Sequence, residues 1–187
     1  GPGMVPDPQA AAALITPHTR AILLVTPNNP SGAEYPAEVL RGFYDLARAR
    51  GLALIVDETY RDFDSRDTAP HGLFADPDWG EVLIQLYSFS KAYRLTGHRV
   101  GALVASEARQ VQVEKLLDTL SICTAQLGQI GALWGMQNLQ GWLAGERQEI
   151  LRRRAAMERA VAGLDGWRLK GCGAYFALVE HPFAEDS

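Results

Sequence analysis

Three short apolar runs, at residues 21–25, 52–56 and 82–87, lie in the first half of the chain, and each has the length of a β-strand. Between the first two runs, apolar residues recur at intervals of three and four positions, which indicates one face of an α-helix. They are Val39, Leu40, Phe43, Leu46 and Ala47. A strand, a helix and a strand at this spacing predict a right-handed crossover, and therefore parallel strands.

A fourth apolar run, at residues 100–105, follows the third too closely for a helical crossover, so we expect it to pair antiparallel. From Ser106 onward the pattern predicts three helices and then two short strands. The helices are expected at 111–120, 127–139 and about 140–164, and the strands at 167–170 and 174–179. Two glycines, Gly171 and Gly173, should separate these last strands.

Composition places the chain among ordinary globular proteins. Hydrophobic residues make up 47% of the 187 residues and charged residues 21%, which is enough for one buried core. The net charge of −4 argues against nucleic acid as a partner, because that role needs a basic face. The sequence has no run of ~18 apolar residues, so we expect no membrane span. Two cysteines without metal-ligand spacing favour reduced thiols and a cytoplasmic location.

The stretch 84–101 holds the strongest candidate chemistry. Lys91 follows the third apolar run in a loop with Ser88 and Ser90, and Arg99 comes eight residues later. Open α/β sheets bind ligands at the carboxyl ends of their strands. Hydroxyls and a guanidinium are suited to a phosphate. A reactive lysine beside a phosphate suggests a phosphorylated aldehyde held as a Schiff base.

Polar clusters follow all three parallel runs, so we expect them along one edge of the sheet. Their motifs are Asn29-Pro30-Ser31-Gly32, Asp57-x-x-Tyr60, Ser88-x-Ser90-Lys91 and Gly97-His98-Arg99-Val100-Gly101. In this order they resemble the class I/II aminotransferases, pyridoxal-phosphate enzymes with the aspartate aminotransferase fold (fold type I). The resemblance implies a three-layer α/β fold. Its mostly parallel sheet has one antiparallel strand after the lysine loop, followed by helices and the start of a small α+β domain.

The resemblance also implies a role for each polar residue of these motifs. Lys91 would form the Schiff base with pyridoxal 5'-phosphate and then move a proton between substrate and cofactor. Asp57 would pair with the pyridine nitrogen. Tyr60 and Asn29 would both reach the phenolic oxygen of the ring.

The phosphate is assigned to Arg99 and Ser88. Ser90 is a further candidate, although its hydroxyl could equally cap the local turn. Asp57 likewise has a rival role as a cap after its strand.

Three other titratable residues near the motifs receive no catalytic role. His98 occupies a position that the motif leaves variable, and His71 lies in a long polar loop. Glu58 should point away from the cofactor, because successive side chains of a strand alternate between its faces.

Residues 1–4 read as the remnant of a cleaved tag. The resemblance makes 5–140 a partial large pyridoxal-phosphate-binding domain, and 141–187 a bridging helix with the start of the small domain. Family members are longer, so we expect a segment that lacks the N-terminal part and most of the C-terminal small domain. Its sheet would then have exposed edges, which invite pairing with another chain. We expect self-association or rearranged edges and, in the family's manner, a homodimer.

The expected activity moves an amino group between an amino acid and a 2-oxo acid. Lyases and decarboxylases of the same fold use the same lysine, aspartate and arginine, so they stay open. A catalytically inactive fragment that only folds and self-associates is a second alternative. A Rossmann domain is disfavoured, because no Gly-x-Gly-x-x-Gly follows the first strand. Four arginines, Arg152, Arg153, Arg154 and Arg159, could suggest nucleic-acid binding, but they lie among glutamates, which is typical of a solvated helix face.

Overall fold

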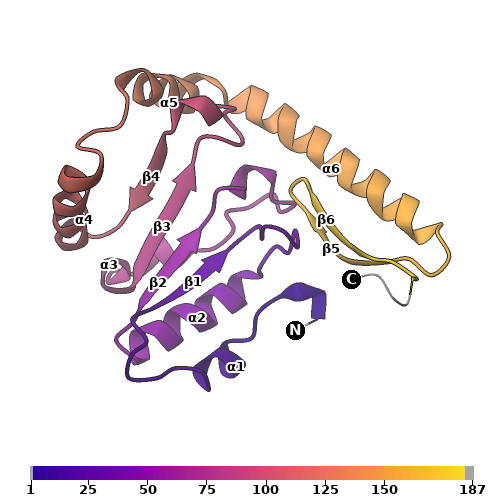
Figure 1. Cartoon of the computed structure of the whole chain (residues 1–187), viewed down its shortest axis with the longest axis horizontal. Coiled ribbons are helices and arrows are strands. Elements are labelled where there is room, and N and C mark those ends of the chain that lie inside the picture. The colour runs from indigo at the N-terminus through magenta and orange to yellow at the C-terminus, as the bar shows by residue number, and fades with distance from the viewer. Residues whose placement is uncertain (1, 184–187) are drawn as a thin grey trace.

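The computed structural model describes residues 2–183, which contain a four-stranded sheet in the order β1-β2-β3-β4 (Figure 1). The strands are β1 (Ala21–Val25), β2 (Ala53–Asp57), β3 (Leu83–Ser88) and β4 (Gly101–Val104). The first three pair in parallel, and β4 pairs antiparallel to β3. The predicted α/β fold class, with one antiparallel strand after the lysine loop, is confirmed.

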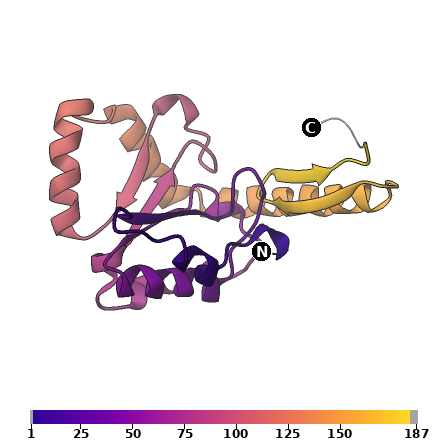
Figure 2. The same ribbon diagram turned by 60° about the horizontal axis from the view of Figure 1, so that its bottom comes forward.

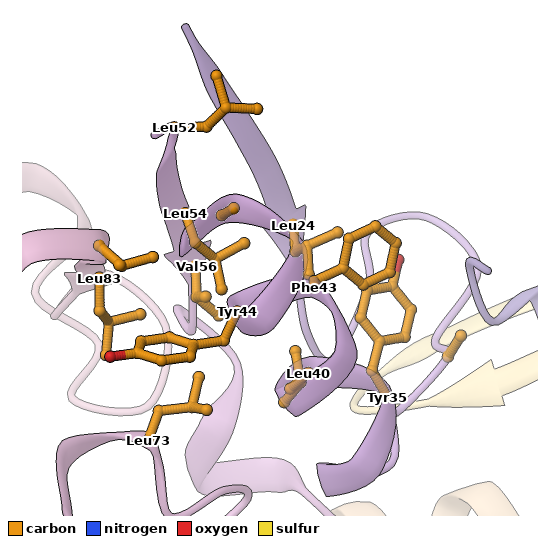
Figure 3. Packing of buried hydrophobic residues seen from close by; sticks show 13 residues of the cluster. Leu24, Tyr35, Leu40, Phe43, Tyr44, Leu52, Leu54, Val56, Leu73 and Leu83 are labelled. Atoms are coloured by element: carbon orange, nitrogen blue, oxygen red, sulfur yellow. The ribbon is translucent and has the colours of Figure 1, made fainter. Parts of the chain in front are cut away.

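Helix α2 (Ala37–Ala49) covers one face of the sheet with the predicted apolar side chains. Phe43 and Tyr44 are almost fully buried, and Figure 3 shows them beside Leu54 and Val56 of β2. Helix α1 (Pro8–Ala12) packs against α2 from outside. This core fixes α2 on the sheet and thereby sets the position of the strand ends.

The large apolar side chains beyond β4 are mostly uncovered. Within the described residues, α4 (Glu107–Leu120) has no buried residue, and α5 (Gln126–Asn138) buries only small ones. The exposed large apolar side chains of these two helices are Val111, Leu116, Leu117, Leu120, Leu127, Ile130, Leu133, Trp134 and Met136. In β1, Leu23 is 61% exposed. Helices α4 and α5 therefore present a group of large apolar side chains to solvent.

Helix α6 (Gln140–Ala162) and the hairpin of β5 (Arg168–Gly173) and β6 (Phe176–Glu180) lie side by side and extend away from the sheet (Figure 2). The predicted break between these strands at the glycines is wrong. Strand β5 runs through both glycines, and the turn falls at Ala174, whose φ is 46°, and Tyr175. The predicted solvated face of α6 is confirmed for Arg152 and Arg153, which are exposed and form ion pairs with Glu149, but Arg154 is partly buried and pairs with Glu34.

Short helical segments complete the chain. They are η1 (Pro2–Met4), η2 (Arg61–Phe63), η3 (Leu73–Ala75), α3 (Trp79–Val82) and η4 (Thr96–His98). Both cysteines are free thiols. Among the described residues, no helix has the length and apolar character needed to cross a bilayer. The division at 1–4, 5–140 and 141–187 stays a prediction, and residues 1 and 184–187 of it lie outside the described part.

Candidate active site

The predicted site residues begin at the carboxyl ends of the parallel strands. The register sets Val25 beside Asp57 and Asp57 beside Leu86. The pairing continues past the strands, because Thr26 N–H donates to the Asp57 carbonyl (3.0 Å) and Glu58 N–H donates to the Leu86 carbonyl (2.9 Å). The loops that follow β1, β2 and β3 are therefore neighbours at one edge of the sheet, as the pattern of polar clusters predicted.

The turn after β1 is closed by Asn28. Its Oδ1 accepts hydrogen bonds from the Ser31 N–H (3.2 Å) and hydroxyl (2.7 Å), and its Nδ2 donates to the Tyr35 hydroxyl (3.2 Å). Asn29 is exposed in the same turn, and the described residues give its side chain no hydrogen-bond partner. The turn-closing role of Asn28 was not predicted, although asparagine is favoured in this type of turn.

Gly32 brings this turn into backbone contact with β5. Its φ of +72° lies in the left-handed region, and a Cβ here would collide with the backbone nitrogen of Gly173. A Cβ at Gly171 would likewise collide with the Ser31 carbonyl oxygen. This close approach explains why β5 keeps glycines inside the strand.

We expect Gly32→Ala to destabilise the protein by clearly more than the roughly 1–2 kcal/mol that a left-handed non-glycine residue costs. Gly51→Ala is the matched control, because Gly51 also has a positive φ (+62°) but nothing within 4 Å of its Cβ position. Comparing the free energies of urea unfolding of the two variants separates the backbone strain, which both share, from the collision with Gly173, which only Gly32→Ala has. Equal losses in the two variants would contradict the tight contact.

Asp57 ends β2 with a half-buried carboxylate. Its Oδ1 accepts from the Thr59 N–H (2.9 Å) and hydroxyl (2.6 Å). In the described part of the chain, Oδ2 has no hydrogen-bond partner. One oxygen therefore caps the local turn, as the rival interpretation expects, while the other stays available to a ligand.

Tyr60 is buried between Lys91 and the β5–β6 hairpin. Lys91 Nζ lies 6.0 Å from the centre of the Tyr60 ring, at the limit of a cation–π contact. The ring meets Tyr175 and Phe176 edge-on, with centroid distances of 5.4 and 4.9 Å. Burial, with the neighbouring Tyr60 hydroxyl, raises the pKa of Tyr175. The structure thus brings together Tyr60 and Lys91, which are far apart in sequence.

The lysine loop is held by its own hydrogen bonds. Ser88 Oγ accepts from the Ser90 N–H (3.3 Å), and the Ser90 carbonyl accepts from the Thr96 hydroxyl (2.8 Å). The turn is therefore capped by Ser88 rather than by the Ser90 hydroxyl.

Arg99 is exposed, with a left-handed φ of 51°. Its Nη1 donates to the Thr96 carbonyl (3.1 Å). Among the described residues, no hydrogen bond joins its guanidinium to Ser88. Arg99 instead lines a cavity of about 490 Å³ that includes the start of α5.

Glu58 points to the opposite face of the sheet, as alternation predicted. It is 0% exposed, and its Oε2 accepts from Gln85 Nε2 and from Arg61 Nη1 (3.3 Å). His71 Nε2 lies 3.3 Å from Oε1, in poor alignment for a hydrogen bond. Burial alone would raise the pKa of Glu58, but these polar neighbours outweigh it and the net shift is downward. His98 is exposed.

A family model described as aminotransferase class I and II matches residues 2–185. The chain is 29% identical over 188 residues to a probable aspartate/prephenate aminotransferase of Thermus aquaticus, covering 97% of this chain and 48% of the relative. It is 32% identical over 175 residues to an arginine–pyruvate transaminase of Pseudomonas aeruginosa, covering 92% and 44%.

The fold gives the same relationship. An aspartate aminotransferase from Thermus thermophilus, solved with maleate, superposes with a TM-score of 0.84 at 26% identity, covering 95% of this chain and 46% of that one. The chain spans about half the length of the curated relatives it matches. Because the family model covers nearly all of it, the chain belongs to the class I and II aminotransferases.

Proposed function

We propose that this chain carries part of the active site of an aminotransferase that moves an amino group between an amino acid and a 2-oxo acid. Pyridoxal 5'-phosphate is the proposed cofactor. The observation that carries the proposal is the placement of Lys91 beside Tyr60, next to the strand end that holds Asp57. The relatives are named for amino acid and 2-oxo acid substrates, which supports this substrate class.

The side chains at this edge suit each reactive part of pyridoxal phosphate. The Lys91 amine suits the aldehyde, and the Asp57 carboxylate suits a protonated ring nitrogen through its available Oδ2. The Ser88 hydroxyl and the Arg99 guanidinium suit the phosphate. Arg99 is exposed and uses one nitrogen on its own turn, so further donors are available. Ser90 stays a candidate for the same group.

When bound, pyridoxal phosphate supplies an electron sink for negative charge at the substrate α-carbon. Lys91 Nζ would take the proton from that carbon, which is the general-base role of a positioned amine. Asp57 keeps the ring nitrogen protonated by its negative charge. Tyr60 and Asn29 are assigned to hydrogen bonds with the phenolic oxygen of the ring.

A second copy of the chain is the proposed macromolecular partner. Within residues 2–183 the outer edges of β1 and β4 have no partner strand, and these edges together with the exposed apolar side chains of α4 and α5 favour association. We expect sedimentation velocity to show a weight-average mass that rises with concentration. The variant Leu120→Asp, at a side chain that is 72% exposed, should lower the association if α4 takes part. A sharp monomer at all concentrations would contradict this expectation.

Amino transfer can be distinguished from the other reactions of this fold by following the substrate nitrogen. The protein is loaded with pyridoxal phosphate and given ¹⁵N-labelled amino acids together with pyruvate or 2-oxoglutarate. Label in the newly formed amino acid supports an aminotransferase. Carbon dioxide or ammonia without labelled product favours a decarboxylase or a lyase. Absence of all products favours the inactive fragment.

A further inference from the structure

Glu58 is a fully buried carboxylate to which the proposed chemistry gives no role. An unpaired charge in such a place would be strongly unfavourable, yet Glu58 is surrounded by polar side chains from three separate segments, two of which donate hydrogen bonds to its Oε2. Gln85 comes from β3, Arg61 from η2, and His71 from the loop before η3. His71 Nδ1 accepts from the Leu73 N–H (3.3 Å), and its Nε2 lies 3.3 Å from Glu58 Oε1 without forming a hydrogen bond.

Both backbone groups of Glu58 form hydrogen bonds, one to strand β3 and one that closes the turn to Arg61. Its N–H donates to the Leu86 carbonyl (2.9 Å), and its carbonyl accepts from the Arg61 N–H (3.0 Å). The Arg61 side chain spans the turn a second time, through Nη1 to Glu58 Oε2. The closed turn encloses Thr59 and Tyr60. The Arg61 side chain therefore ties the far end of the segment that carries the Tyr60 ring to the Glu58 carboxylate.

Asp57 and Tyr60, which flank Glu58 and Thr59 in the sequence, belong to the candidate site at the strand ends. Asp57 precedes Glu58 with the opposite side-chain direction, and Tyr60 follows within the turn that Glu58 closes. We infer that Glu58 is a positioning residue, which holds Asp57 and Tyr60 in place from the buried face of the sheet through Gln85, Arg61 and His71. The inference rests on the proposed function, because it assigns the two positioned side chains to the cofactor.

The first test needs no cofactor. In Glu58→Gln, the carboxamide keeps the shape of the side chain but loses the charge and turns an NH₂ group toward donors. We expect amide hydrogen exchange in a peptide covering 57–62 to become about tenfold faster than in the parent, with peptides of β1 and α2 unchanged. Glu114→Gln, on the exposed helix α4, is the matched control and should change nothing.

Two further variants separate positioning from general loss of stability. Glu58→Gln combined with Gln85→Glu restores a carboxylate–amide pair across the two strands, and should recover part of the protection. Arg61→Met, at a side chain that is 37% exposed, removes the bridge while leaving Glu58 in place, and should loosen the same peptide. Unchanged exchange at 57–62, or equal acceleration in every peptide, would overturn the inference.

The second test uses pyridoxal phosphate itself. We expect Glu58→Gln to raise the dissociation constant of pyridoxal phosphate by about tenfold, the lower end of what residues that support the ligands of a binding site contribute. Lys91 should still be the lysine that borohydride reduction links to pyridoxal phosphate. An unchanged dissociation constant would overturn the positioning role. If the parent protein does not label at Lys91, the proposed function fails, and the exchange measurement still decides whether Glu58 holds the turn.

Discussion

Replacing Lys91 by arginine is expected to lower amino transfer by roughly 10²–10⁴-fold or more, the range lost with a general acid–base group. Arginine keeps the positive charge beside Tyr60, but its guanidinium cannot be deprotonated in proteins and so cannot take a proton from the substrate. It also lacks the primary amine needed to bind an aldehyde covalently. The rate of ¹⁵N transfer and the pyridoxal phosphate retained after gel filtration should both fall.

Lys115→Arg is the control for this change. Lys115 lies on the exposed face of α4, so the same substitution there alters neither the candidate site nor its surroundings. A Lys91→Arg protein that transfers nitrogen and retains cofactor like the Lys115→Arg protein would remove Lys91 from the mechanism.

A large loss of stability is expected when the core between α2 and the sheet is disrupted. Phe43 is 2% exposed and packs among the buried side chains of the sheet face, near Leu24 and Tyr35 (Figure 3). We expect Phe43→Ala to cost about 3–5 kcal/mol, because it removes apolar contacts and leaves a cavity. Domains of this kind have a total stability of about 5–15 kcal/mol, so a substantial unfolded fraction should appear at low urea.

Leu14→Ala removes a side chain that is 79% exposed and should stay within about 0.5 kcal/mol of the parent. Urea unfolding, followed by far-ultraviolet circular dichroism, measures both. A loss below about 1 kcal/mol for Phe43→Ala would mean that the packing of α2 on the sheet is wrong.

The elements of this fold could be predicted where local pattern and tertiary contact agree. The apolar period of α2 and the apolar run of β2 predicted the correct elements, because both elements bury apolar side chains at the positions that the pattern indicates. The prediction of the hairpin strands failed because their glycines allow a backbone contact with Gly32, about 140 residues away in sequence. A pattern in the local sequence cannot reveal that contact.

In the candidate site, too, local geometry was predictable from the sequence and tertiary contacts were not. Alternation placed Asp57 and Glu58 on opposite faces, since it depends only on strand geometry. The partners of Glu58 could not be predicted, because Gln85 and His71 come from segments that meet only in the folded chain. The turn-closing hydrogen bonds of Asn28 and Ser88 were not predicted, for a more local reason. Each lies near a similar residue, and hydrogen-bond geometry decides which of the two closes the turn.

The most direct test of the central claim, that Lys91 belongs to a cofactor site, is to add pyridoxal phosphate, reduce with borohydride and map the modified lysines by mass spectrometry. The sequence has three lysines, and the other two, Lys115 and Lys170, serve as internal references. We predict a stoichiometric adduct on Lys91 alone. Adducts spread over Lys91, Lys115 and Lys170 would show ordinary surface amines and contradict the claim.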